Sequence, residues 1–313
     1  MNFEGLLESI ESFDTITIYR HVNPDCDAVG SQFGLKNWIR DNYPNKEVYA
    51  LGHQVCTQAD WPKSDIADDD TVKASLAIIL DTANKDRVDD DRFITAAKII
   101  KIDHHPNKDP FGDLMFVDET SAATCQILAL YFDSLNKTLS KKTSEYLYRG
   151  LLTDTLNYTT SNTSEETLKA GGILASKGLD LSKISHDVFD NSLRGFNFTG
   201  YIISHVKVLN NHLAYLVIPK EDHESFGFNA SDARSFVGKL GNVKDFDIWC
   251  IFTEKKDQDG NTLYDGSLRA KSIQVNDVAE KFGGGGHKNA AGVKNLTNND
   301  LEVVLDLLAR KIN

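Results

Sequence analysis

The sequence predicts an α/β protein with a larger parallel-sheet domain followed by a smaller α/β domain. Three apolar segments, residues 15–19, 75–80 and 98–102, are rich in β-branched side chains, and aspartate or histidine follows each within two residues. Segments with helical periodicity lie between and after them, which is typical of a parallel sheet covered by helices. The 313 residues, 41% of them hydrophobic, are enough to form two cores.

Residues 15–19 predict the first strand because β-branched and aromatic side chains alternate there, and residues 28–42 predict the helix that follows. Residues 75–80 and 98–102 are apolar enough to be buried on both faces, as in a parallel sheet. Sites in open parallel sheets form beyond the carboxyl ends of the strands. We therefore expect the polar groups after these three strands to meet at one edge.

Helical periodicity continues after the third strand, and several segments open with serine or threonine near an acidic residue. The helices expected next cover residues 122–135, 143–152, 165–177 and 182–189. We expect a first domain over residues 1–191, a connecting helix over 193–209 within a linker at 192–210, and a second domain over 211–313. In the second domain the pattern predicts strands at 213–218, 246–253 and 263–270 and helices at 231–240, 276–282 and 299–311.

The composition disfavours several classes of protein. A formal net charge of -12 disfavours tight, sequence-blind binding to long nucleic acid, because the polyanion would meet the protein's own negative field. A short anionic substrate remains compatible, since bound cations would reverse that field locally. We expect no signal peptide and no membrane association. The four cysteines form no CxxC pair, which favours a reducing cytoplasm, and the sequence leaves a homodimer open.

The segment HVNPDCDA, residues 21–28, holds the densest group of candidate metal ligands. His21, Asp25 and Asp27 combine imidazole and carboxylate groups in a loop that Pro24 stiffens. Such groups hold divalent cations that activate water for attack on phosphorus. For this segment alone, an N-capping loop with incidental acids is the alternative interpretation.

Further candidate ligands follow the next two strands. Asp81 comes directly after residues 75–80, and Asp103-His104-His105 comes directly after residues 98–102. A carboxylate at Asp81 can bridge two ions at the separation of roughly 3.5–4 Å that is typical of two-metal phosphoryl chemistry. Asp154 ends an apolar helical stretch, where a helix-ending acid is the stronger interpretation from the residues alone.

The run GGGGH, residues 283–287, is the strongest feature of the predicted second domain. Glycines leave backbone N–H groups accessible, so the run can form an anion-binding nest to which His287 adds a donor. Arg269, on a predicted strand just upstream, can bind a phosphate with two parallel hydrogen bonds. A flexible linker and an exposed salt-bridging arginine are the competing interpretations.

Together these residues resemble the DHH phosphoesterase superfamily. HVNPDCDA matches the pattern HxxPDxDA, and Asp81, the triplet Asp103-His104-His105 and Asp154 follow in family order. Ser267-Leu268-Arg269, together with GGGH and AAG within residues 284–292, resembles the DHH-associated C-terminal domain. The likeness is greatest to the nanoRNase group of bifunctional oligoribonucleases and pAp-phosphatases. This resemblance implies an active site in the cleft between the two domains.

The resemblance also implies two divalent cations, most often manganese. The implied ligands are His21, Asp25 and Asp81 for one ion and Asp27, Asp81, His104 and Asp154 for the other. Of the catalytic residues, His105 would face the substrate phosphate, and Asp103 would orient the neighbouring imidazoles. The implied substrate-binding residues are Arg269, Gly284, Gly285, Gly286 and His287.

The expected activity is manganese-dependent hydrolysis of very short oligonucleotides, among them pApA, the linear product of cyclic di-AMP, with dephosphorylation of pAp as a second activity. A DHH-type inorganic pyrophosphatase is the first alternative, but a glycine nest with one arginine suits a nucleotide better than pyrophosphate. The acidic charge disfavours a RecJ-like exonuclease on long DNA. The complete ligand set disfavours a non-catalytic adenine dinucleotide sensor, because clustered carboxylates repel one another without a cation.

Overall fold

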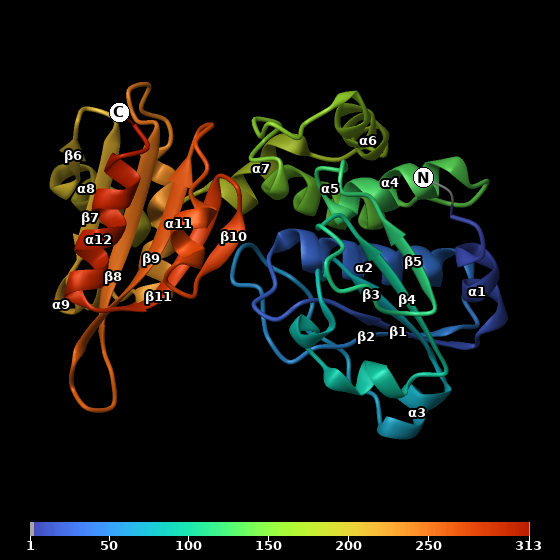
Figure 1. Ribbon diagram of the computed structural model, residues 1–313. Helices are drawn as coiled ribbons and strands as arrows, with labels where there is room; N and C mark the ends of the chain where they lie inside the picture. The colour runs from blue at the N-terminus through green and yellow to red at the C-terminus, as the bar shows by residue number, and fades with distance from the viewer. Residues whose placement is uncertain (1–2, 313) are drawn as a thin grey trace. The chain divides into compact units, whose positions relative to one another are not determined.

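The computed structural model describes residues 3–312 and divides into two compact units, with the boundary between Asp190 and Asn191 (Figure 1). Unit 1 contains a five-stranded parallel sheet, and unit 2 contains a six-stranded mixed sheet. These sheets confirm the α/β class and the parallel first sheet that the sequence predicts. No helix within residues 3–312 combines the length and the apolar character that a membrane span requires.

The sheet of unit 1 has the strand order β2-β1-β3-β4-β5. Its strands are β1 (Thr15–Tyr19), β2 (Glu47–Ala50), β3 (Leu76–Leu80), β4 (Lys98–Asp103) and β5 (Leu114–Val117). Every residue of β3 is buried, as expected for an apolar strand covered on both faces. In this strand order the three predicted strands, β1, β3 and β4, are neighbours at the centre of the sheet. The two strands that the sequence analysis did not predict, β2 and β5, are short and lie outside them.

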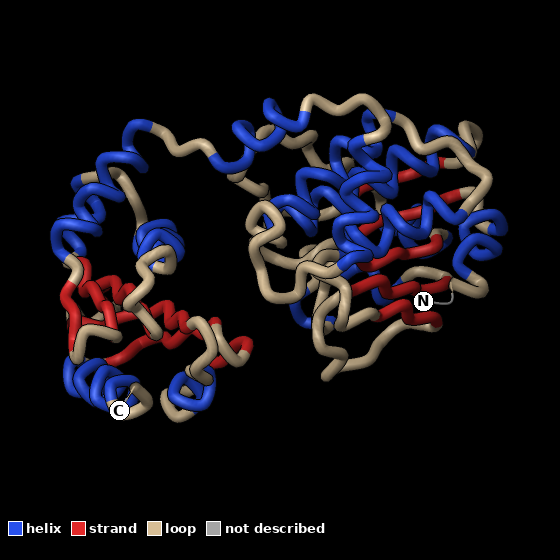
Figure 2. Tube along the Cα trace, turned by 90° about the horizontal axis from the view of Figure 1, so that it is seen from above, coloured by secondary structure: helices blue, strands red, loops and turns tan. Residues whose placement is uncertain are grey.

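The helices of unit 1 are α1 (Leu6–Ser12), α2 (Cys26–Asn42), α3 (Asp69–Ala74), α4 (Thr124–Ser134), α5 (Lys141–Asp154), α6 (Glu165–Ala175) and α7 (Leu181–Phe189). Figure 2 shows several of these helices packed along the strands. Two glycines let α2 and α5 approach closely. A Cβ atom at Gly30 would lie 2.6 Å from the Tyr146 carbonyl oxygen, and one at Gly150 would lie 2.9 Å from Asp27 Cα. This contact packs the helix that ends in Asp154 against the start of α2.

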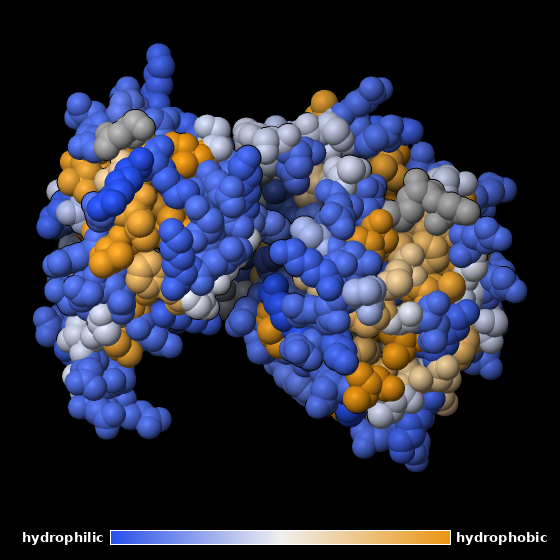
Figure 3. All heavy atoms as spheres, in the orientation of Figure 1, coloured by the Kyte–Doolittle hydropathy of each residue, from blue (hydrophilic) through white to orange (hydrophobic). Residues whose placement is uncertain are grey.

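Unit 2 has the strand order β10-β11-β9-β8-β7-β6, in which β7 and β8 are parallel and the other pairs are antiparallel. Its strands are β6 (Lys207–Leu209), β7 (Leu213–Ile218), β8 (Ile248–Lys256), β9 (Thr262–Ala270), β10 (Gly285–His287) and β11 (Ala290–Leu296). Its helices are α8 (Leu193–His205), α9 (Lys220–Ser225), α10 (Ala230–Ser235), α11 (Asn276–Glu280) and α12 (Asn298–Ala309). On the face shown in Figure 3, hydrophilic residues predominate in unit 2, and hydrophobic residues gather beside α12.

Two expectations for unit 2 are wrong in their local structure. The helix expected over residues 193–209 ends at His205, and Val206 adopts an extended backbone that leads into β6. The helix expected over residues 231–240 is α10 followed by a 3₁₀ turn, Phe236–Leu240. In the first case, pairing of β6 with β7 overrides the apolar periodicity of the segment.

The glycine run is partly a strand. Residues 285–287 form β10 at the edge of the sheet, and its partner is β11. A Cβ atom at Gly284 would lie 2.2 Å from the Gly292 carbonyl oxygen, and one at Gly286 would lie 2.4 Å from the Ala290 carbonyl oxygen. Glycine is therefore needed for close backbone approach. Because β10 is an edge strand, only the side that faces away from β11 can offer backbone N–H groups to a ligand.

Candidate active site

The candidate site lies at the carboxyl edge of the parallel sheet in unit 1. His21 follows β1, Asp81 follows β3, and His104 and His105 follow β4. Asp81 has a left-handed backbone with φ of 53°, which few residues other than glycine adopt. Asparagine and aspartate tolerate this conformation best, and such backbone strain concentrates at functional sites.

The first group of side chains consists of His21, Asp25 and Asp81, whose ligand atoms lie within 4.8 Å of one another. His21 Nε2 lies 3.6 Å from Asp25 Oδ2 and 3.5 Å from Asp81 Oδ2. His21 Nδ1 lies 2.8 Å from the Val22 carbonyl oxygen, which can only accept, so Nδ1 carries the proton and Nε2 faces the carboxylates. The other oxygen of Asp25 caps α2 by accepting from the backbone N–H groups of Asp27 and Ala28. Asp25 therefore both caps a helix and faces the site.

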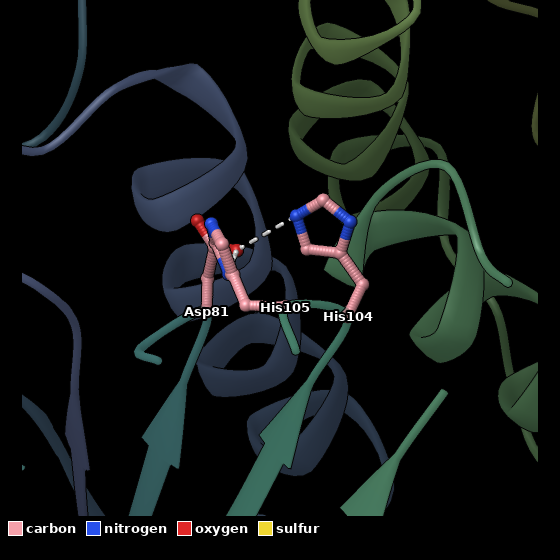
Figure 4. Close-up of side chains that lie close together, drawn as sticks. All are labelled: Asp81, His104 and His105. Atoms are coloured by element: carbon pink, nitrogen blue, oxygen red, sulfur yellow. Dashed lines mark ion pairs between the residues drawn. The ribbon is translucent and has the colours of Figure 1, made fainter. Parts of the chain in front are cut away.

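The second group consists of Asp27, His104 and Asp154. His104 Nε2 lies 3.4 Å from Asp154 Oδ2, 3.9 Å from Asp27 Oδ2 and 3.4 Å from Asp81 Oδ1. Figure 4 shows the His104 ring pointing toward Asp81. Asp81 thus presents Oδ2 to the first group and Oδ1 to the second. One carboxylate joins the two groups.

His105 forms a third group with Asp81 and His104, in which His105 Nδ1 lies 3.6 Å from Asp81 Oδ1, and it also contacts Asp103. His105 Nδ1 donates to Asp103 Oδ1 at 2.8 Å, and the same oxygen accepts from the backbone N–H of His104 and of His105. Asp103 is fully buried, and Lys101 Nζ lies 3.3 Å from its other oxygen. These contacts fix the orientation of the His105 ring and of the turn that follows β4.

The start of α4 supplies hydrogen-bond donors to the site that the sequence does not predict. The backbone N–H groups of Thr124 and Cys125 donate to the two oxygens of Asp27 at 2.7 and 2.9 Å, and Thr124 Oγ1 donates to Asp81 Oδ1 at 3.1 Å. The N-terminus of a helix stabilises a buried carboxylate in this way. The sequence predicted that this helix begins at residue 122, two residues before its actual start at Thr124. It therefore did not indicate that the N–H groups of Thr124 and Cys125 would face Asp27.

In unit 2 the sheet register brings Arg269 and His287 into one row. Ala290 of β11 pairs with Arg269 on one side and with His287 on the other. Two strand spacings therefore separate their backbones, roughly 9.5 Å. Arg269 Nη1 donates to the Leu268 and Ala291 carbonyl oxygens, which orients the guanidinium. Gly284, Gly285 and Gly286 precede His287 along the exposed edge.

Comparison with known proteins identifies both parts of the chain. Residues 15–151 match the DHH family, N-terminal domain, and residues 210–313 match the DHHA1 domain. The bifunctional oligoribonuclease and PAP phosphatase NrnA of Bacillus subtilis (strain 168) is 36% identical over 92% of this chain and 91% of its own length. The chain belongs to the DHH family. A second DHH relative, the probable NrnA of Streptococcus mutans, is 31% identical over 93% of this chain and 92% of its own length.

A solved structure also resembles this DHH protein over nearly its whole length. The exopolyphosphatase-related protein from Bacteroides fragilis superimposes with a TM-score of 0.86 at 25% identity. The match covers 98% of this chain and 94% of that chain. The DHH and DHHA1 architecture of this chain is therefore shared with an experimentally determined structure.

Burial and neighbouring charges shift the pKa values of the groups in this DHH site. Burial and the charge of Asp81 raise the pKa of Asp27 to about 7, and burial and neighbouring carboxylates raise the pKa of Asp154. Burial also opposes ionisation of Asp81, but His104 and His21 outweigh it and hold its pKa well below the usual value. For His21, Asp25 and Asp81 outweigh the effect of burial and raise its pKa to about 10. In the metal-free chain, protons shared with histidines thus balance the carboxylate charge.

The donor set fits divalent cations. Each of the three groups offers carboxylate oxygens and imidazole nitrogens, which suit manganese, iron and zinc. Carboxylates that are buried close together are stable only with positive charge nearby. The raised pKa values of Asp27 and Asp154 show that, without a metal, protons supply this charge, and a bound cation would replace them. The chain therefore has clusters able to bind metal, as expected of a DHH phosphoesterase.

Binding of a divalent cation should release protons near pH 7. Asp27 has a pKa of about 7 and His21 one of about 10, so cations must displace protons from this site. We expect the apparent affinity for Mn²⁺ to rise from pH 6 to pH 8, with at least about one proton released per chain. Titration calorimetry in two buffers with different ionisation enthalpies measures this release. Equal heats in both buffers would contradict the expectation.

Proposed function

We propose that this chain is a manganese-dependent phosphodiesterase that hydrolyses very short oligonucleotides, including pApA, to mononucleotides, and that it also dephosphorylates pAp. The observation that carries this proposal is the shared Asp81 carboxylate, whose two oxygens face two separate groups of histidine and aspartate. The Bacillus subtilis relative is a bifunctional oligoribonuclease and PAP phosphatase, which supports short oligoribonucleotides and pAp as substrates. Since pApA is the linear product of cyclic di-AMP, the reaction would complete its degradation. Four free buried cysteines favour a reducing cytoplasm.

The proposed ligands are His21, Asp25 and Asp81 for one cation and Asp27, Asp81, His104 and Asp154 for the other. When bound, the cations would lower the pKa of water and neutralise charge on the phosphoryl oxygens. The N–H groups at the start of α4 hold the Asp27 carboxylate in place. We propose that His105, oriented by Asp103, donates a proton to the departing oxygen.

We propose that Arg87 binds a phosphoryl oxygen of the substrate. Its Nη2 lies 3.5 Å from His21 Nδ1, the ring nitrogen opposite the one that faces the carboxylates, so its exposed side chain lies beside the His21 ring. Since Nδ1 already donates to the Val22 carbonyl oxygen, it cannot accept from Arg87. The Arg87 carbonyl oxygen accepts from the backbone N–H of Val22 at 2.7 Å, which ties its segment to the His21 loop. Among the described residues, no carboxylate forms an ion pair with Arg87.

Replacing Arg87 with alanine should lower kcat/KM for pApA about 100-fold, because an arginine contact to a transferring phosphoryl group stabilises charge in the transition state. Lys85→Ala is the matched control, since Lys85 is an exposed cation on the same 3₁₀ turn. Steady-state rates and bound manganese should be measured for both variants. Equal losses in both variants would mean that Arg87 contributes only general positive charge.

We propose that residues 1–191 form the catalytic domain, that residues 192–210 connect the domains, and that residues 211–313 bind substrate. In the second domain, Arg269, Gly284, Gly285, Gly286 and His287 would bind the nucleotide. Arg269 supplies a positively charged guanidinium donor, and His287 supplies a ring N–H. The edge of β10 supplies backbone N–H groups.

The proposal is tested by four substrates supplied to metal-stripped protein that has been reloaded with manganese. We expect the highest initial rates on pApA and on a five-nucleotide RNA, a lower rate on pAp, and no appreciable rate on pyrophosphate. Chromatography of the products should show AMP released from pApA. Faster turnover of pyrophosphate than of pApA would overturn the assignment of substrate. Tight binding of pApA without hydrolysis would instead indicate a nucleotide sensor.

A further inference from the structure

Unit 1 contains a cavity of about 640 Å³ that the proposed metal site does not use. Residues 51–68, which join β2 to α3 without any helix or strand, supply most of its lining. A connection of this length without regular structure inside a compact domain is uncommon and is usually functional. The loop, and the cavity that it lines, are therefore expected to have a function of their own.

Apolar and aromatic side chains line the cavity. Val55 and Ile66 are 77% and 92% exposed, which is unusual for two branched aliphatic residues that border one cavity. The Trp61 indole stacks on Tyr146 with ring centroids 5.9 Å apart, and its Nε1 donates to the Gln58 carbonyl oxygen at 2.8 Å. These contacts hold the indole in a fixed orientation. The cavity thus offers a rigid aromatic ring beside exposed aliphatic side chains, a surface suited to a flat heteroaromatic ring.

The charges around the cavity favour an anionic ligand. Two acids in the lining are neutralised, since Asp65 forms an ion pair with Lys36 and Asp90 forms one with Arg92. Lys63 is exposed, and within the described part of the chain no carboxylate forms an ion pair with it. A lining with paired acids and one unpaired lysine has a net positive charge, as a phosphate-bearing ligand requires.

The cavity wall is joined to the loop that carries the proposed metal ligands. Gln54 Oε1 accepts from the backbone N–H of Asn23 at 2.6 Å, and the Gln58 carbonyl oxygen lies 3.5 Å from Cys26 Sγ. Arg20, which lines the cavity, directly precedes His21, which faces the carboxylates. A polymeric ligand bound at the metal site therefore has a second subsite close by within the same unit.

We propose that this cavity binds a nucleobase of the oligonucleotide substrate, with the adjoining phosphate at Lys63. The ring would lie against Trp61 and contact Val55 and Ile66. Stacking of this kind tolerates any base, because every base presents a π face. The identity of the ligand as substrate rests on the proposed function, whereas the affinity of the cavity for a nucleotide does not.

The first test measures binding of AMP to the full chain in EDTA, where no metal supports binding at the cluster. Quenching of tryptophan fluorescence reports occupancy, and Trp61→Phe should remove the signal. We expect Val55→Asp and Ile66→Asp to weaken AMP binding at least tenfold. Ile94→Asp is the matched control, because Ile94 is 64% exposed and lies outside the cavity. Equal affinity for AMP in wild type and in all three aspartate variants would overturn the proposal.

The second test measures hydrolysis of a five-nucleotide RNA by the manganese-loaded variants. We expect Ile66→Asp to raise KM at least tenfold with kcat unchanged, and Ile94→Asp to match wild type. If wild type hydrolyses no substrate but binds AMP in an Ile66-dependent way, the proposed function fails and the nucleotide cavity stands. If wild type hydrolyses the RNA and Ile66→Asp matches it in both tests, the cavity proposal fails alone.

Discussion

Asp81→Asn should reduce hydrolysis of pApA at least about 1000-fold, because in the proposed mechanism the shared carboxylate would position both cations, whose combined effect on the transition state would amount to several kcal/mol. Asparagine keeps the size of the side chain and tolerates the left-handed backbone at this position, where φ is 53°. It also keeps an oxygen that can accept from Thr124 Oγ1. The loss should therefore come from the missing charge and not from misfolding.

Initial rates, bound manganese and thermal unfolding should be measured together for this variant. Asp133→Asn is the matched control, because it removes one negative charge from an exposed position on α4. We expect Asp81→Asn to bind less than two manganese ions per chain and Asp133→Asn to bind as many as wild type. An Asp81→Asn variant that keeps full turnover would show that the reaction does not depend on a bridging carboxylate.

The sequence predicted the part of the site that follows from local pattern. Apolar runs located β1, β3 and β4, and the rule for parallel sheets placed His21, Asp81 and His104 at one edge. The structure brings these three side chains together with Asp81 between the two histidines. Residues far apart in the chain could be grouped because strand ends are visible in the sequence.

Tertiary contacts account for what the sequence did not show. The N–H groups of Thr124 and Cys125 reach Asp27 only because α4 starts beside the first loop. Arg87 lies on a short 3₁₀ turn with no apolar periodicity, and only the pairing of the adjacent Val88 with His21 and the Val22–Arg87 backbone hydrogen bond place it beside the His21 loop. Likewise, the glycine run gives no sign of strand pairing, because residue propensity opposes β structure there and the partner β11 imposes it.

Replacing each of the two adjacent histidines with alanine should affect metal binding and kcat differently. His104 Nε2 faces three carboxylates, Asp27, Asp81 and Asp154, so His104→Ala should lose manganese. His105 Nδ1 lies 3.6 Å from Asp81 Oδ1 but is held more closely by Asp103 at 2.8 Å, so His105→Ala should keep its metal. Its kcat for pApA should nevertheless fall about 100- to 10,000-fold, the usual contribution of a positioned proton donor.

Metal analysis and single-turnover rates of the two variants distinguish these roles. The expected result is a His105→Ala protein with two bound manganese ions and a greatly slowed chemical step, beside a His104→Ala protein depleted of metal. Asp103→Asn adds an independent check, because it weakens the contact that orients the His105 ring without changing the ring itself. We expect its kcat to fall about 10- to 100-fold, less than for His105→Ala. If His105→Ala loses metal while His104→Ala retains it, the roles of the two histidines must be exchanged.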